Sequence, residues 1–294
     1  MSPTAFHEPA DLADACALLA ANPWGAKAIS GGTAIVLMLR NGLIAPESFI
    51  SLARIGGLRG IAVEDGVLRI GAGTTLAEVA ASPAIREHAP SVASACELVG
   101  NPRVRNVATI GGNLAEADYA SDPPATLASV GARCAVTGTA GRRTVEVIDL
   151  ITGFYETVLE PDELITHVEI PLPAGPRGAV YLKYRTRSSE DRACVGVAAR
   201  VDFRDGAVGD LDVVVAAVAS TLQRVPDPLA AARGRRLEPP VIREVARGYA
   251  DAIDPMDDAR GSAGYRRKMI EVFVRRALEQ VAGQQRGSGG GARG

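Results

Sequence analysis

"NVATIGGNLAEADYASDPPATLASVGA", residues 106–132, is unlike ordinary structural sequence. An apolar approach ends in Gly111, Gly112 and Asn113, and a short acidic stretch with prolines then leads into an alanine-rich run. Glycine permits positive φ and lets another group approach the main chain closely. Successive N–H groups in such a loop form an anion-binding nest. The stretch therefore indicates either a ligand-binding loop or a tight turn packed against a helix.

A second glycine loop, "AISGGTAIVLM" (28–38), has the same two interpretations. Gly31, Gly32 and Thr33 come directly before an apolar stretch with helical spacing. The N-terminus of a helix concentrates unpaired N–H groups and partial positive charge, which suits a phosphate. If both loops bind a ligand, each would supply donors to one phosphate of a diphosphate. Neither loop is specific by itself.

Composition limits the class of protein. The chain has 294 residues, 47% of them hydrophobic and 22% charged, which is typical of a soluble globular protein with one large or two ordinary domains. The formal net charge of -2 gives no basic field for nucleic acid. We expect no transmembrane segment, because no apolar stretch reaches the roughly 18–20 residues that span a bilayer. The acidic N-terminal region is not that of a signal peptide, so we expect a cytoplasmic location.

The cysteines and histidines are scattered and form no metal-binding spacing. We therefore expect no metal site, no iron–sulfur cluster and no catalytic triad on this chain. The four cysteines are expected to be buried free thiols. The cysteines are Cys16, Cys96, Cys134 and Cys194, and the histidines are His7, His88 and His167.

Hydrophobic periodicity and turn residues predict a mixture of helices and strands. In the first part of the chain we expect helices at 9–23, from 33 onward, from Thr74 or Thr75, and in "PSVASACELVG", with strands at 26–29, 47–52, 132–138, 142–153 and 163–173 and a hairpin at 58–73. After a boundary near 175–178, we expect an antiparallel sheet and two helices, 239–253 and 261–282. The order predicts an α+β chain with domains at 1–175 and 176–282 and a flexible tail at 283–294.

Six motifs in order resemble the FAD-binding medium subunit of the molybdenum hydroxylases, the family of xanthine dehydrogenase and carbon monoxide dehydrogenase. The two glycine loops match the recurring marks of that subunit as "SGGTAI" and "TIGGN". The other four are "ADYASD" (117–122), "ELITHVEIP" (163–171), "YLKYRTRSSEDRA" (181–193) and "DDARGSAGYRRKM" (257–269). The likeness covers about residues 3–282.

The resemblance implies a two-lobed FAD-binding domain of the vanillyl-alcohol-oxidase-like type, followed by a smaller α+β domain. It also implies that bare main chain faces the FAD diphosphate because the ligand takes the place of side chains. The implied cofactor-binding residues are Lys27, Ile29, Ser30, Gly31, Gly32, Thr33, Ala34, Ile35, Val104, Ala108, Thr109, Gly111, Gly112, Asn113, Ala115, Ser121, Asp122, Ile165 and Lys183. Val99 and Gly100 precede the second loop, where the family packs against the isoalloxazine. No catalytic residue and no metal ligand are expected here.

Several of these residues have a second interpretation. Asp122 matches a position that contacts the flavin nucleotide, and it also precedes two prolines as an N-cap residue would. Lys27 and Lys183 match lysines near the cofactor, where an ammonium would stabilise negative charge on the reduced ring, but each is equally compatible with a surface lysine. Ala34 replaces a residue that is often polar, and Tyr119 stands where proline is common.

By resemblance, electrons pass from two [2Fe–2S] clusters on a small partner subunit to FAD on this chain, and then to NAD, a quinone or oxygen. Substrate is hydroxylated at a molybdopterin cofactor on a large partner subunit, in a dimer of heterotrimers. Two alternatives remain open: a self-sufficient FAD-dependent oxidase, and a flavin-free scaffold subunit.

Overall fold

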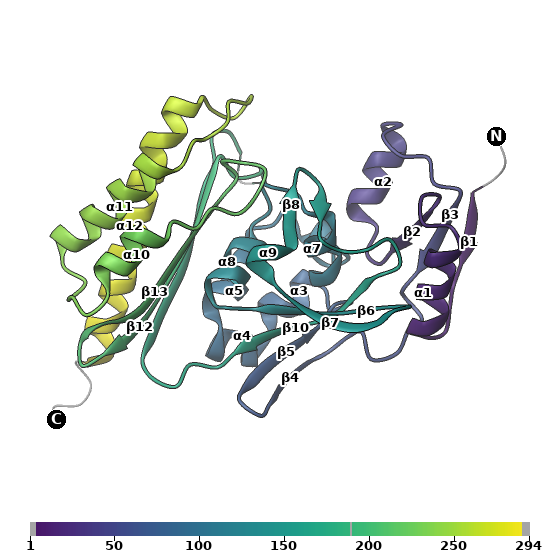
Figure 1. Cartoon of the computed structure of the whole chain (residues 1–294), viewed down its shortest axis with the longest axis horizontal. Coiled ribbons are helices and arrows are strands. Elements are labelled where there is room, and N and C mark those ends of the chain that lie inside the picture. The colour runs from purple at the N-terminus through teal and green to yellow at the C-terminus, as the bar shows by residue number, and fades with distance from the viewer. Residues whose placement is uncertain (1–3, 189, 290–294) are drawn as a thin grey trace.

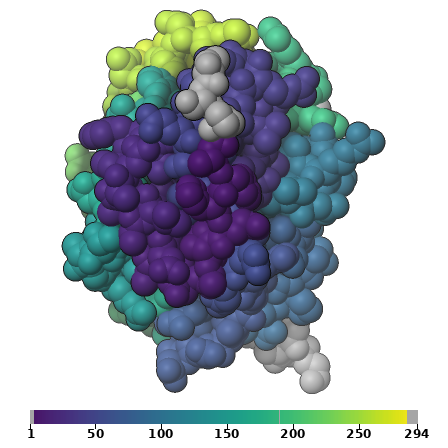
Figure 2. Space-filling view, turned by 90° about the vertical axis from the view of Figure 1, so that its right-hand side faces the viewer, coloured from purple at the N-terminus to yellow at the C-terminus, as the bar shows by residue number. Residues whose placement is uncertain are grey.

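The computed structural model describes residues 4–188 and 190–289 (Figure 1). The N-terminal segment forms a small lobe at one end of the molecule, seen end-on in Figure 2. Its parallel sheet has the order β1 (Ala5–His7), β3 (Ser48–Ser51), β2 (Ala26–Ile29), with helices α1 (Leu12–Ala21) and α2 (Thr33–Arg40). The predicted helices and the strands at 26–29 and 47–52 are confirmed. Strand β1 was not predicted, because three exposed residues carry no alternating pattern.

The second lobe is a five-stranded sheet with helices packed on one face. Its order is β4-β5-β10-β6-β7, and β10 pairs antiparallel with both β5 and β6. The strand that completes this sheet therefore comes from the end of the domain. The strands are β4 (Ile61–Glu64), β5 (Val67–Gly71), β6 (Arg133–Gly138), β7 (Gly141–Glu146) and β10 (Leu164–Pro171); the helices are α3 (Leu76–Ala81), α4 (Pro83–His88), α5 (Pro90–Glu97), α6 (Pro102–Arg105), α7 (Ile110–Glu116) and α8 (Pro123–Ser129).

The predicted strand at 142–153 is interrupted at residues 147–150. A helical turn, α9 (Val147–Leu150), follows β7, and a small hairpin of β8 (Ile151–Gly153) and β9 (Glu156–Thr157) comes next. Val147 and Leu150 are both fully buried. Residues three apart share one face of a helix but opposite faces of a strand, so helical geometry is what buries both side chains.

The C-terminal half has an antiparallel sheet, as predicted, formed by β11 (Arg177–Tyr184), β12 (Val195–Arg204) and β13 (Ala207–Ala216). Helices α10 (Pro226–Ala232), α11 (Pro239–Ala252) and α12 (Ala263–Gly289) cover one face. The other face packs against α5 and α8 of the preceding lobe. Tyr181, Ala198 and Val214 from this sheet consequently belong to the same core cluster as the interior of the second lobe.

Helix α12 continues past the predicted end at residue 282, so the expected flexible tail is helical as far as Gly289. Glutamine is a good helix former, which favours continuation through Gln284 and Gln285. The side chain of Gln284 also donates to the carbonyl oxygen of Ala179 at 3.5 Å. Among the described residues, no helix has the length and apolar character needed to cross a membrane.

Candidate flavin-binding site

A cleft of about 510 Å³ lies where the small lobe meets the second lobe, and both glycine loops line it. The first loop leaves β2 and enters α2. The second loop enters α7. The hydroxyl of Thr109 donates to Ser30 Oγ at 3.2 Å, which joins the two loops directly. The structure therefore brings together two segments that lie almost eighty residues apart in the sequence.

The first loop presents free main-chain donors. Gly32 is the N-cap of α2, has φ of 68°, and has no side chain to cap the helix. Within the described residues, no acceptor is bonded to the N–H groups of Thr33, Ala34 or Ile35. Ordinarily a capping side chain satisfies one of these groups. The N-terminus of α2 is thus an uncapped group of donors that faces the cleft.

The second loop is different from the predicted nest. It is the first turn of α7, and Thr109 is its N-cap, accepting from the N–H of Gly112 at 3.2 Å. The N–H groups of Ile110 and Gly111 donate to the carbonyl oxygens of Thr74 and Ala72. Protein acceptors already occupy these donors, so the second loop has fewer free donors than the first.

The expectation that ligand takes the place of the missing side chain is wrong for Gly111, and the same packing argument applies to Gly31. A Cβ at Gly31 would collide with the carbonyl oxygen of Val107, and one at Gly111 would lie 2.5 Å from the Cβ of Ala72. Protein packing is what requires glycine at both positions. Gly112 is exposed and lines the cleft, and an added Cβ would meet only its own helix cap, Thr109 Oγ1, at 2.8 Å. Gly112 is therefore the glycine of this loop whose open side faces the cleft.

Most of the predicted cofactor-binding residues line this cleft. They are Lys27, Ser30, Gly31, Gly32, Thr33, Ala34, Ile35, Val104, Ala108, Thr109, Gly112, Asn113 and Ala115, together with Val99. The others do not line it: Ile29, Gly111, Ser121, Asp122, Ile165 and Lys183. Ser121 lies one contact away, since its hydroxyl donates to Asn113 Oδ1 at 3.0 Å.

Asp122 and Lys183 form a buried ion pair at the joint with the C-terminal sheet. Lys183 Nζ is 2.7 Å from one carboxylate oxygen of Asp122, and the hydroxyl of Tyr181 donates to the other at 2.7 Å. Lys183 also donates to the carbonyl oxygen of Leu98 at 3.0 Å, beside the cleft-lining Val99. Burial raises the pKa of Asp122, and Lys183 and Tyr181 oppose that rise. Asp122 occupies the N-cap position of α8, but its side chain does not cap the helix.

Several residues that line the cleft were not predicted from the sequence. Asp118 lies inside a quoted motif without an assigned role, and Arg192 lies inside another. Arg192 comes from the C-terminal half and forms an ion pair with Asp118 at 3.0 Å. No spacing in the sequence connects them, because the contact depends on how the two halves pack. The missed lining residues also include Leu19, Pro23, Leu37, Glu116, Thr157, Leu159, Glu160, Pro161 and Glu163.

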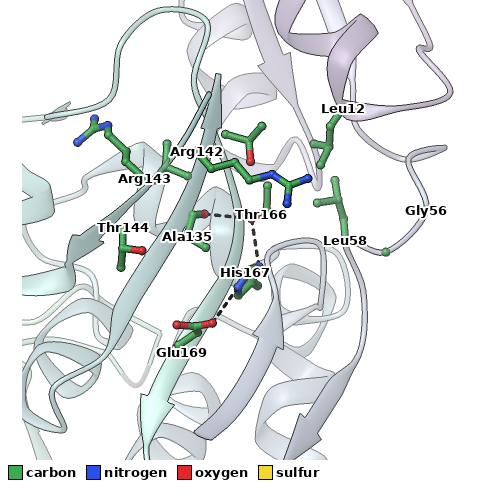
Figure 3. Close-up of a pocket in the computed structure, with 13 residues that line it drawn as sticks. Leu12, Gly56, Leu58, Ala135, Arg142, Arg143, Thr144, Thr166, His167 and Glu169 are labelled. Atoms are coloured by element: carbon green, nitrogen blue, oxygen red, sulfur yellow. Dashed lines mark hydrogen bonds and ion pairs between the residues drawn. The ribbon is translucent and has the colours of Figure 1, made fainter. Parts of the chain in front are cut away.

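A second pocket, of about 450 Å³, lies on the solvent side of the five-stranded sheet near the start of α1 (Figure 3). Neither glycine loop contributes to it. Its central polar groups are bonded to one another, with His167 Nδ1 3.1 Å from Thr166 Oγ1 and Nε2 3.1 Å from Glu169 Oε1. Of the two pockets, only the cleft combines free main-chain donors with apolar walls, which is the usual character of a cofactor site.

A family model described as "FAD binding domain in molybdopterin dehydrogenase" matches residues 2–173, and one described as "CO dehydrogenase flavoprotein C-terminal domain" matches residues 180–281. The chain is an FAD-binding medium subunit of the molybdenum hydroxylase family. The predicted family and fold are confirmed, and FAD is the cofactor of this domain.

Relatives of this flavoprotein subunit match along almost the whole chain. It is 32% identical to the nicotine 6-hydroxylase medium subunit of Paenarthrobacter nicotinovorans, over 94% of this chain and 96% of the relative. It is 33% identical to the carbon monoxide dehydrogenase medium chain of Afipia carboxidovorans, over 94% and 96%. A structure of carbon monoxide dehydrogenase from Hydrogenophaga pseudoflava superimposes with a TM-score of 0.91 at 32% identity, covering 95% of this chain and 97% of that one.

The residues of the cleft fit a dinucleotide. The three uncapped N–H groups at the start of α2 match the oxygens of a phosphate, and the helix dipole adds partial positive charge. Gly112 adds no side chain to the facing wall at its own position. Val99, Val104 and Ala108 add an apolar wall. The described residues contain no group of His, Cys, Asp or Glu able to hold a metal ion.

Proposed function

We propose that this subunit passes electrons from [2Fe–2S] clusters of a small partner subunit, by way of FAD, to an external acceptor such as NAD, a quinone or oxygen. A large partner subunit would carry the molybdopterin and the substrate site, and two copies of each subunit would form a heterohexamer. The names of the relatives support this division, because medium subunits and medium chains are parts of larger enzymes. Bound FAD supplies the redox chemistry, and the protein binds, orients and tunes it.

The uncapped N-terminus of α2 in the cleft is the observation that carries the proposal. In it, Ser30 to Ile35 bind one phosphate through main-chain N–H groups, and Gly112 and Asn113 form the facing wall. Val104 and Ala108 contact the ring system, with Ile165 packed behind them. Asp122 and Lys183 support the wall at Leu98 from the side of the C-terminal sheet.

Two alternatives make different predictions. A self-sufficient FAD-dependent oxidase would turn over substrate without partner subunits. A flavin-free scaffold would fold and assemble with the cleft empty. The free donors in the cleft favour a flavin-binding role over the scaffold, since a scaffold gains nothing from leaving them uncapped.

The test uses the chain purified with its co-expressed partners. FAD released by denaturation is quantified per chain, and we expect close to one. The complex is then reduced with limiting dithionite, with and without its flavin, and mixed with NAD, a quinone or oxygen. We expect rapid oxidation only when flavin is present. A folded complex that takes up no FAD, or that reduces the same acceptor equally fast without it, would overturn the proposal.

A further inference from the structure

Glu116 is the unexplained carboxylate of the flavin cleft. Four acidic residues line the cleft, and two of them are neutralised by arginine: Asp118 by Arg192 at 3.0 Å, and Glu163 by Arg143 at 2.6 Å. Glu160 is exposed to solvent. Glu116 is half-buried at the end of α7, and among the described residues its side chain forms neither an ion pair nor a hydrogen bond.

The surroundings of Glu116 come from three parts of the fold. Burial raises its pKa, Lys27 on β2 opposes the rise, Asp118 adds to it, and Arg192 from the C-terminal half opposes it. A half-buried carboxylate without a hydrogen-bond donor is unfavourable, since desolvation is not offset by new bonds. A ligand that brings a donor to this position would remove that cost.

The charges of the cleft separate it into two regions. A diphosphate carries negative charge and suits the uncapped N–H groups at the start of α2. An ionised carboxylate repels phosphate but accepts strong hydrogen bonds from sugar hydroxyls, as the acidic residue of dinucleotide-binding folds does. Glu116 stands at the opposite end of α7 from Thr109, the residue that joins the two loops. The hydroxyl-bearing part of a dinucleotide therefore matches this end of the cleft.

We propose that Glu116 accepts a hydrogen bond from a sugar hydroxyl of FAD and thereby fixes how the dinucleotide lies in the cleft. This inference rests on the proposed flavin-binding function and adds a positioning residue to it. The bond is strongest when the carboxylate is ionised. FAD affinity should consequently fall as the pH falls through the pKa of Glu116, which burial has raised.

The test measures FAD binding to the full-length apo chain by flavin fluorescence, without any assay of turnover. Glu116→Ala should weaken FAD binding about ten- to a hundredfold, the range for a charge-assisted hydrogen bond. Glu116→Gln should weaken it less and should remove the pH dependence. Glu64→Ala, at an exposed carboxylate on β4 outside the cleft, is the matched control and should change affinity less than about twofold. Circular dichroism checks that each variant is folded.

Binding of two fragments of FAD shows which sugar hydroxyl donates to Glu116. ADP carries the ribose, and FMN carries the ribityl chain. Loss of affinity of Glu116→Ala for ADP alone assigns the ribose, and loss for FMN alone assigns the ribityl chain; either result supports the proposal. Unchanged FAD binding by folded Glu116→Ala would overturn the proposal. Tighter binding would also overturn it, because it would mean that the carboxylate repels FAD. If the wild-type chain and its complex bind no FAD, the proposed function itself fails.

Discussion

The two glycine loops have nearly the same sequence character and opposite physical properties. The first loop leaves its N–H groups free, because Gly32 has no side chain with which to cap α2. In the second loop almost all of the main-chain N–H groups already donate to acceptors on Thr109, Ala72 and Thr74. The first loop is therefore a donor surface for the ligand, whereas the second is a self-satisfied helix start that forms the facing wall. A Gly-Gly pair alone does not distinguish these two roles.

The largest effect should come from the packed glycines. Gly111→Ala places a Cβ 2.5 Å from Ala72 in the interior, and overpacking of this kind lowers the free energy of unfolding by about 3 kcal/mol. Urea unfolding monitored by circular dichroism measures this change. Gly264→Ala is the matched control, because its added Cβ meets open space in the first turn of α12. If Gly111→Ala were as stable as this control, the packing explanation would be wrong.

The next largest effect should be on the ligand. Gly112→Leu fills the open side of the second loop, and we expect FAD affinity to fall at least about a hundredfold, or roughly 2.7 kcal/mol. Thr144→Leu places the same side chain in the pocket of Figure 3 and should leave FAD affinity unchanged. Fluorescence titration of the apo chain with FAD compares them. Full FAD affinity in Gly112→Leu would remove this loop from the ligand site.

A smaller effect should follow from changing the backbone conformation of the first loop. Gly32 has φ of 68°, and a residue with a Cβ in this left-handed region costs roughly 1–2 kcal/mol. We expect Gly32→Ala to lose about that much stability in thermal unfolding. Gly32→Asn should lose less, since asparagine adopts this region more readily. Equal losses for Ala and Asn would mean that side-chain contacts, and not φ, decide this position.

The smallest effect should come from the helix cap of the second loop. Thr109→Ala removes the acceptor of the Gly112 N–H and the bond to Ser30, which costs about 1 kcal/mol of stability. Thr109→Ser keeps the hydroxyl and should restore most of it. The same unfolding measurement compares both variants with the wild type, and a stable Thr109→Ala would show that the cap contributes little.

Local sequence patterns predicted the longer helices and strands in order and brought both glycine loops forward, but not the short elements β1, α4, α6 and α10. Alternation and turn residues predicted the hairpin around Asp65 and Gly66, because that information is local. The apolar run after Gly32 predicted α2 for the same reason. The helical turn at Val147 was missed, since its burial depends on packing against α8 in the core.

The ion pairs that join the two halves could not be predicted from the sequence. Asp122 and Lys183 were each predicted near the flavin, but nothing local indicated that they bond to each other. The pairing of Arg192 with Asp118 likewise depends on tertiary packing. The reason for glycine at position 31 lay in a carbonyl oxygen on the other loop, which no pattern within "SGGTAI" reveals.

The buried pair of Asp122 and Lys183 has a consequence for how this chain can be divided. One member belongs to the FAD-binding half and the other to the C-terminal sheet, and Tyr181 extends the second lobe's core across the same joint. Separating the halves would leave a buried carboxylate without its cation, which is strongly unfavourable. The two halves should therefore unfold as a single cooperative unit. A chimera built from two relatives would have to inherit both ends of this pair together.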